Sequence, residues 1–183
     1  MTLHRTLLLH KPAGYVCSQA ESGLRVVDLL PKELRLQQPA FNTVGRLDKD
    51  TTGLLLLTTD GALLHRLTHP KHHLPKTYMV TLADPLRGDE AVVFASGTLM
   101  LRGETKPLRP AQLVPTGTHT ATLTLHEGRY HQIKRMFGAV GNRVVGLHRA
   151  QFGALTLDGL TVGQWRELTA TELAALNRAV PVG

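Results

Sequence analysis

The residues best suited to chemistry lie in one short loop, at positions 45–53. Arg46, Asp48, Lys49 and Asp50 bring two cations and two carboxylates into five positions. A loop that carries fixed charge and is anchored to a rigid buried element is a common place for binding and catalysis. A solvated charged turn is the simpler interpretation of the same residues. The bracketing glycines, and further basic and aromatic segments along the chain, favour chemistry.

The acids of this loop fit three kinds of chemistry. Asp48 and Asp50 could be the paired carboxylates of a glycoside hydrolase. They could also hold a magnesium ion, which prefers oxygen ligands. In the third arrangement, one carboxylate works on a nucleoside while cationic residues hold RNA around it. A hydrolytic triad is not indicated, because the acid has no Ser-His or Cys-His partners.

The elements that must position the loop are strands and helices in irregular order. Leucines at 54–57 predict a buried strand directly after the loop. Without a dinucleotide fingerprint or a P-loop, the order favours an α+β fold with a mixed, largely antiparallel sheet and flanking helices. Further strands are predicted at 6–10, 15–18, 76–82, 99–101, 108–114, 120–125, 144–147, 155–157 and 165–168. Helical segments are predicted at 26–30, 61–68, 87–96 and 130–140 and from Thr169, with a surface connection at 31–41.

Composition points to an anionic partner. Lys and Arg outnumber Asp and Glu by 21 to 14, which favours nucleic acid over an acidic membrane surface. Aromatic residues make up only 4%, which argues against a single-strand binder built on several stacking platforms. The lone cysteine, Cys17, cannot form an intrachain disulfide. No apolar run approaches the ~20 residues of a membrane span, and no signal peptide is indicated. We therefore expect a cytoplasmic protein.

Positive charge is concentrated between residues 126 and 149. Five basic residues face one acid there, a net charge of +4 out of +7. Tyr130, His131, Gln132 and His148 are interleaved with them and can stack on or hydrogen-bond a base. A second cluster holds four histidines at 65–73. Zinc is conceivable there, but no cysteine is near and Pro70 interrupts the spacing, so a basic face for RNA is favoured.

Five ordered motifs resemble those of the pseudouridine synthases of the RsuA branch. GRLD at 45–48 with TGLL at 52–55 is similar to the family signature. The other four, in the family's order, are KPAGY at 11–15, KTY at 76–78, GRYHQIKRMF at 128–137 and VVGLHR at 144–149. The resemblance spans roughly residues 6 to 170. It implies an isomerase that detaches uracil from its sugar, turns it over and rejoins it through carbon.

The resemblance also implies residue roles. Asp48 matches the catalytic aspartate, Tyr78 the tyrosine that stacks on the uracil and takes the proton from carbon 5, and Lys134 the cation that pairs with the aspartate. Arg46 matches a residue that fills the gap left by the flipped base, and Leu147 an apolar pocket residue. The basic motif adds Arg129, His131 and Gln132 as substrate-binding residues. No metal or organic cofactor is expected.

The resemblance finally sets the expected substrate and domain plan. We expect one uridine of ribosomal RNA as target, and the segment 70–78 favours the small-subunit RNA. A large-subunit enzyme and a non-catalytic RNA-binding or ribosome-assembly protein of the same fold are the alternatives. Residues 1–183 would form one catalytic domain, or two subdomains flanking a central cleft. The motifs begin within ten residues of Met1, so the small basic domain that often precedes them is expected to be absent. Ribosomal RNA or assembly intermediates are the expected partners of a monomer without membrane attachment.

Overall fold

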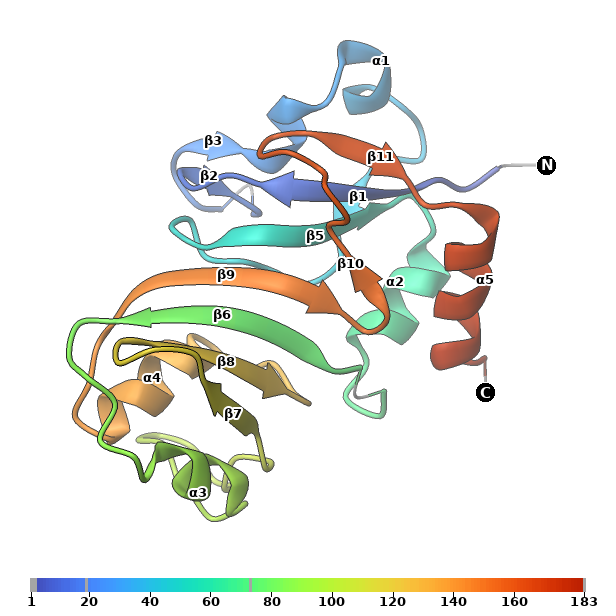
Figure 1. The fold of residues 1–183 in the computed structure, drawn as a ribbon. Coiled ribbons are helices and arrows are strands. Elements are labelled where there is room, and N and C mark those ends of the chain that lie inside the picture. Colours follow the sequence, from blue (N-terminus) through green and yellow to red (C-terminus); the bar gives the residue numbers. More distant parts are fainter. Residues whose placement is uncertain (1–2, 19, 73, 183) are drawn as a thin grey trace. The chain divides into compact units, whose positions relative to one another are not determined.

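The chain divides into two compact units. The computed structural model describes residues 3–18, 20–72 and 74–182. Unit 1 comprises Met1–Leu74 with Gly153–Gly183, and unit 2 comprises Pro75–Phe152. Among the described residues, the strand pairs of known register are antiparallel, apart from one parallel pair in unit 1. With helices beside these strands (Figure 1), the predicted α+β class is confirmed.

Unit 1 is built around two strands, β1 (Thr6–Lys11) and β5 (Thr52–Thr58), that are buried along almost their whole length. β1 lies between β11 (Trp165–Glu167) and β5, and β4 (Asn42–Thr43) also pairs with β5. In the register of β1 and β5, leucine faces leucine at three consecutive positions. The leucines of both strands are at most 1% exposed. An uninterrupted leucine run, rather than an alternating one, is the pattern of a strand covered on both faces.

Shorter elements complete unit 1. The helix α2 begins at Asp60, whose carboxylate accepts the backbone N–H groups of Ala62 and Leu63. In α5, the capping residue Thr169 and Glu172 exchange hydrogen bonds between side chain and backbone. The elements are β2 (Tyr15–Val16), β3 (Leu24–Arg25), η1 (Val26–Leu29), α1 (Lys32–Arg35), α2 (Gly61–Thr68), β10 (Leu155–Thr156) and α5 (Ala170–Ala179).

Unit 2 is an antiparallel sheet with helices packed against it. Its strands lie in the order β9 (Val144–Phe152), β6 (Lys76–Leu82), β8 (Thr120–Leu125) and β7 (Gln112–Pro115). Every second residue of β6 and β8 is buried, as their alternating sequences predict. The helices are α3 (Glu90–Ala95) and α4 (Gln132–Ala139). Phe94 of α3 meets Phe137 of α4 edge to face, with ring centroids 5.1 Å apart.

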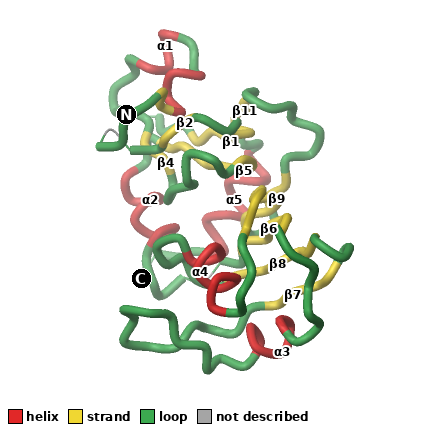
Figure 2. The backbone as a smooth tube through the Cα atoms, turned by 90° about the vertical axis from the view of Figure 1, so that its left-hand side faces the viewer, coloured by secondary structure: helices red, strands yellow, loops and turns green. Residues whose placement is uncertain are grey.

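Four local predictions differ from the structure. No strand forms at 99–101, and the connection between α3 and β7 is loop along its length (Figure 2). Its apolar Leu101 and Leu108 are buried in the core without forming a strand. β9 extends beyond residue 147 to Phe152 because its pairing with β6 continues. The connection 31–41 contains α1, which buries Leu34. α4 starts at Gln132, because His131 has a left-handed backbone with φ of +47°.

The described residues form no helix with the length and hydropathy that a bilayer crossing requires.

Candidate active site

Asp48 lies in unit 1, in the loop that joins β4 to β5. Its side chain is half-buried, while the preceding Leu47 is buried. The backbone N–H of Thr51 donates to the backbone carbonyl of Asp48 at 3.0 Å and closes a turn that begins at Asp48. The Cys17 sulfur lies 3.5 Å from both the nitrogen and the oxygen of Leu47. The loop is therefore tied down on both sides of Asp48.

The strongest of these ties is a buried lysine. Lys11 is 0% exposed at the end of β1. Its ammonium donates to the carbonyl oxygens of Pro12 at 3.0 Å, Lys49 at 3.1 Å and Thr51 at 2.7 Å. The Lys49 oxygen also accepts the N–H of Gly14 at 2.8 Å. Two carbonyls that follow Asp48 are thus fixed to the KPAGY segment. Residues that hold a reacting group in one geometry supply part of the catalytic power of a site.

The surroundings of Lys11 explain how a charge is accommodated there. Burial lowers the pKa of Lys11, because desolvation disfavours the ammonium form. The neighbouring acidic groups act in the opposite direction, Cys17 most strongly, followed by Asp50 and Asp48. Sequence reasoning gave Lys11 no role. The available signal was a lysine that closes an otherwise apolar buried strand, since a buried charge needs partners.

Arg46 stands at the exposed side of the same loop. Its side chain is 62% exposed and forms an ion pair with Glu21. Gly45 before it has a φ of +72°, and Gly53 after the loop has a φ of +116°. Side chains rarely adopt these backbone conformations, which explains why glycines bracket the loop. Substrate binding by Arg46 stays a prediction, and its exposure leaves it accessible to RNA.

Tyr78 and Leu147 lie on one face of the sheet in unit 2. Tyr78 on β6 is the register partner of Arg149 on β9, and Val80 is the partner of Leu147. Positions two apart on a strand share a face, and register partners share it too. Tyr78 is 8% exposed, whereas Leu147 is half-buried. The strand pairing shifts between Thr77 and Tyr78, so the register is irregular at the candidate catalytic tyrosine.

Two cations share the surroundings of Tyr78. Lys76 precedes it on the same face of β6, and Arg149 faces it across the ladder. The Lys76 nitrogen lies 5.8 Å from the ring centroid of Phe152, and the Arg149 guanidinium carbon lies 5.4 Å from it. Burial lowers the pKa of Lys76, and the charge of Arg149 adds to that shift against the opposing effect of Glu127. This part of unit 2 suits a group that carries negative charge or carbonyl oxygens.

Lys134 is carried by α4, also in unit 2. Its side chain is half-buried, and the helix is fixed by Ile133, Met136 and Phe137, which are 4% exposed or less. Tyr78, Leu147 and Lys134 therefore belong to unit 2, while Arg46 and Asp48 belong to unit 1. The catalytic roles of these residues stay predictions.

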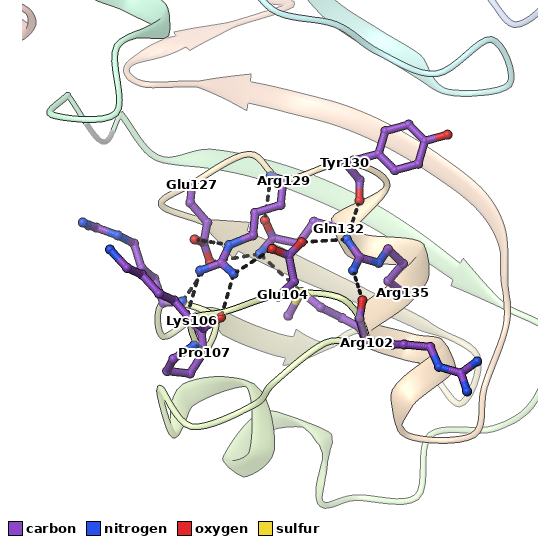
Figure 3. Close-up of polar contacts among 11 residues, drawn as sticks. Arg102, Glu104, Lys106, Pro107, Glu127, Arg129, Tyr130, Gln132 and Arg135 are labelled. Atoms are coloured by element: carbon purple, nitrogen blue, oxygen red, sulfur yellow. Dashed lines mark hydrogen bonds and ion pairs between the residues drawn. The ribbon is translucent and has the colours of Figure 1, made fainter.

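The basic motif is largely engaged within the protein (Figure 3). Arg129 donates from Nε to Glu127 at 3.0 Å, and its terminal nitrogens donate to the carbonyls of Lys106 and Pro107, both at 2.8 Å. Its guanidinium also lies 3.6 Å from Glu104. Arg129 thereby fastens the loop before β7 to the segment before α4.

Gln132 and Arg135 belong to the same network. The side chain of Gln132, 4% exposed, accepts the N–H of Arg129 at 3.0 Å and donates to Glu127 at 3.2 Å. Arg135 pairs with Glu104 at 3.0 Å and donates to the carbonyls of Tyr130 and Arg102. Since Arg149 is buried as well, three of the five basic residues of this segment serve internal contacts. Substrate binding by Arg129 and Gln132 stays a prediction, beside the structural role that these contacts describe.

His131 differs from its neighbours in this motif. It is exposed, and its ring stacks on that of Tyr130 with centroids 3.8 Å apart and an angle of 26°. Tyr130 is itself 75% exposed. The pair forms an aromatic surface at the start of α4, of the kind on which unpaired bases stack. The prediction that His131 binds substrate remains open to test.

The part of the chain that the structure describes holds no candidate metal centre. Among the described residues, no group of three or more His, Cys, Asp and Glu side chains is arranged to hold a metal ion. His65, His69 and His72 are included in that statement, whereas His73 lies outside the described residues.

Comparisons with known proteins address the family directly. The model of the RNA pseudouridylate synthase family matches residues 5–139. A ribosomal small subunit pseudouridine synthase A from Vibrio cholerae is 48% identical over 179 residues, which cover 96% of this chain and 76% of that protein. The protein of the same name from Pasteurella multocida is 47% identical over 176 residues, 94% of this chain and 73% of its own. A crystal structure described as a pseudouridylate synthase is 44% identical, with a TM-score of 0.88 over 96% of this chain and 75% of that one. The chain therefore belongs to the RNA pseudouridylate synthase family.

Proposed function

We propose that this protein isomerises a uridine of small-subunit ribosomal RNA to pseudouridine, with Asp48 as the catalytic carboxylate. The proposed substrate is supported by sequence identity: almost half the residues, along nearly the whole chain, are identical to those of small-subunit pseudouridine synthases. The proposed reaction is supported by the family to which the chain belongs. The candidate residues have the chemical groups that this reaction requires.

The reaction rearranges atoms without gaining or losing any. The bond between N1 of uracil and C1′ of ribose breaks, the ring turns, and a bond forms between C5 and C1′. The hydrogen of C5 leaves, and N1 is protonated. No oxidant, reductant or second substrate is required. The demands on the protein are a carboxylate to start the cleavage, a proton acceptor for C5, and a wall that keeps the detached base from diffusing away.

Asp48 suits the first demand because its loop is rigid and charged. An aspartate carboxylate is ionised at neutral pH, since its pKa in water is about 3.9. The three carbonyl contacts of Lys11 and the turn closed by Thr51 hold the backbone around Asp48 in one conformation. A carboxylate placed in advance does not spend binding energy on becoming ordered during the reaction.

Tyr78, Lys134 and Leu147 are the proposed partners in the reaction. A phenol ring can stack on uracil, and its oxygen can take the proton from C5. Lys134 supplies positive charge that keeps a carboxylate ionised in a dry site. Leu147 offers an apolar surface to the base. Arg46 and His131, both exposed, are the proposed contacts to RNA around the extruded nucleotide, whose removal from its stack costs a few kcal/mol.

The setting of the reaction follows from its substrate. We propose that the protein works in the cytoplasm as a monomer, on ribosomal RNA or on ribosomal assembly intermediates. We also propose that residues 1–183 act as one catalytic domain composed of the two units. No metal ion and no organic cofactor is assigned a role.

The test is substitution of Asp48 by Asn with a matched control. Asp48→Asn removes the charge with little change in shape, and Asp50→Asn makes the same change two residues away in the same loop. Small-subunit RNA labelled with tritium at C5 of uridine releases tritium as the new bond forms. We expect no release with Asp48→Asn, near-normal release with Asp50→Asn, and RNA binding within about threefold of the unsubstituted protein for both. Tritium release by Asp48→Asn at the rate of the unsubstituted protein would show that Asp48 is not the catalytic carboxylate.

The target RNA is identified in cells. Carbodiimide labels pseudouridine and stops reverse transcription at it, so ribosomal RNA from a deletion strain shows which site depends on the gene. We expect one missing site, in the small-subunit RNA. A missing site in the large-subunit RNA instead would correct the substrate. An unchanged map would favour an RNA-binding or ribosome-assembly protein that does not catalyse.

A further inference from the structure

The histidine cluster of unit 1 lines a hollow that the proposed reaction does not use. The hollow has a volume of about 320 Å³. It lies at the end of α2, where the chain turns toward residue 74, and next to the segment that follows α5. Its lining residues are Ala62, His65, Arg66, His69, Lys71, His72, Pro181 and Val182.

The imidazole rings follow one another around this hollow. His65 meets His69 edge to face with ring centroids 5.4 Å apart, and His69 meets His72 in the same manner at 6.3 Å. Nδ1 of His69 accepts the backbone N–H of Lys71 at 3.1 Å, which orients that ring and closes a tight turn. Three imidazoles and the ammonium of Lys71 are thereby brought to one surface.

Arg66 joins the hollow to the C-terminal segment of unit 1. Its Nε donates to the carbonyl of Val180 at 2.8 Å, and a terminal nitrogen donates to the side chain of Asn177 at 2.5 Å. These contacts fix the guanidinium at the lining of the hollow, to which Pro181 and Val182 also belong. Asp60, the acid of α2, caps the opposite end of that helix.

The titratable side chains among the described residues that line the hollow are all basic. α2 contributes His65 and Arg66, the turn after it contributes His69, Lys71 and His72, and the segment after α5 contributes no titratable side chain. Among the described residues that line it, none is an acid. A concave surface lined by cations and imidazole donors, with no acid among its described lining side chains, suits a phosphate group.

We infer that this hollow binds a backbone phosphate of the RNA substrate, away from the nucleotide that reacts. The inference rests on the proposed function only for the identity of the RNA. Each phosphate that a cation neutralises releases counterions, so the contact adds affinity without reading sequence. The exposed Lys71, His65 and His69 are accessible to such a phosphate, while Arg66 links α2 to the carbonyl of Val180.

The imidazoles give this contact a pH dependence with a definite sign. A protonated imidazole attracts a phosphate more strongly than a neutral one, so binding should strengthen as pH falls from 8 to 6. Each proton that the histidines take up on binding changes Kd by at most about tenfold per pH unit. Lys71 adds a contact that is charged throughout.

The experiment measures RNA binding rather than turnover. Anisotropy of a labelled small-subunit RNA transcript gives Kd for the full chain over a series of salt concentrations and from pH 8 to pH 6. The variants are Lys71→Gln and the triple variant His65→Gln, His69→Gln, His72→Gln. The matched controls are Lys32→Gln, an exposed lysine of α1, and His119→Gln, an exposed histidine of unit 2. Arg66 is left in place because it holds the fold.

We expect Lys71→Gln to lower the slope of log K against log salt by about 0.7 to 0.9, the value of one phosphate contact. The triple variant should lose most of the tightening between pH 8 and pH 6. Lys32→Gln and His119→Gln should follow the unsubstituted protein in both measurements. If Lys71→Gln has the salt slope of the unsubstituted protein and the triple variant has its pH dependence of Kd, the inference is wrong.

A second arm distinguishes the source of the phosphate. Inorganic phosphate titrated into the protein alone should shift the NMR signals of the three hollow histidines together and leave that of His119 in place. If phosphate shifts these signals but the variants bind RNA with the Kd of the unsubstituted protein, the hollow binds a free anion and the RNA contact is refuted. If poly-glutamate competes with RNA for the hollow as well as unlabelled RNA does, an acidic protein replaces RNA as the partner. Neither the RNA-binding experiment nor the phosphate titration requires catalysis. Absence of pseudouridine formation would therefore refute the proposed function without affecting the evidence for phosphate binding in the hollow.

Discussion

Replacement of Lys11 by methionine tests whether the candidate active-site loop is held from behind. Methionine has nearly the same length and fits a site that is 0% exposed, but it donates no hydrogen bond. The carbonyl oxygens of Pro12, Lys49 and Thr51 lose the Lys11 donor together, although the Lys49 oxygen still accepts the N–H of Gly14. We expect a loss of stability and a larger loss of turnover, with RNA binding nearly unchanged.

The three contacts do not count equally. The contact with Thr51 is buried, at 2.7 Å, whereas the contacts with Pro12 and Lys49 are partly buried. A buried acceptor without a donor costs about 1–3 kcal/mol, and an acceptor that water can reach costs much less. Release of the desolvated ammonium, whose pKa is lowered by burial, offsets part of the loss. Together these effects predict a decrease of about 1–3 kcal/mol in the free energy of unfolding, close to the cost of the one buried acceptor.

The effect on turnover follows from geometry. Asp48 lies directly before Lys49, whose carbonyl the ammonium holds. Displacement of a catalytic group by about 1 Å can cost a factor of about 100 in rate. We therefore expect kcat to fall by between ~10-fold and ~100-fold in Lys11→Met, while Kd for RNA stays within about threefold.

The assays are urea unfolding, tritium release and RNA anisotropy, with two comparison variants. Lys49→Met removes an exposed lysine side chain from the same loop and should change stability by less than about 0.5 kcal/mol. Lys11→Arg retains the charge but overfills a closed site, at a cost of about 1–3 kcal/mol. If Lys11→Met unfolds at the same urea concentration as the unsubstituted protein and turns over at the same rate, the loop does not depend on Lys11.

Two further predictions concern ion pairs. Arg166 holds Glu172 by two hydrogen bonds, at 2.7 and 2.8 Å, and lowers the pKa of Glu172 to about 2. The depressed pKa stabilises the fold above pH 4.5, and this stabilisation is lost as pH falls toward 2. After allowance for solvent screening, Glu172→Gln should lower the free energy of unfolding by about 1–2 kcal/mol at pH 7. Urea titrations should show a progressively smaller loss below pH 4.5. Glu104 pairs with Arg129 and Arg135, so Glu104→Gln should cost about 1 kcal/mol and speed amide exchange in residues 102–109. Unchanged exchange there would show that the arginines hold the loop through its carbonyls alone.

The fold could be predicted where the sequence has a clear period. The leucine runs of β1 and β5, the alternation in β6 and β8 and the capping signal at Thr169 each correspond to one local structure. The loop before β7 illustrates the opposite case. Leu101 and Leu108 are buried in the core from a loop. Burial of single side chains does not require a strand. The late start of α4 depends on a left-handed residue that is not glycine, His131, which local propensity disfavours.

The candidate site could be predicted by motif but not by contact. A lysine before a proline does not reveal that its ammonium will reach carbonyls forty residues along the chain, as Lys11 reaches Thr51. Nor does a run of basic residues reveal their partners. The acids that engage Arg129 and Arg135 lie partly outside the run, at Glu104. Charge counted along the sequence therefore overstates the charge that is available to a ligand.

That difference changes where RNA affinity must come from. Arg129 and Arg135 are paired with acids, and Arg149 is buried. Cations in these positions neutralise few phosphates, because they are already engaged within the protein, and therefore they release few of the counterions that surround the RNA. The salt dependence of RNA binding should then respond more to exposed cations outside the basic motif than to those within it. Lys71→Gln should consequently change the salt slope more than Arg135→Gln does, although Arg135 belongs to the family motif and would be chosen first from the sequence.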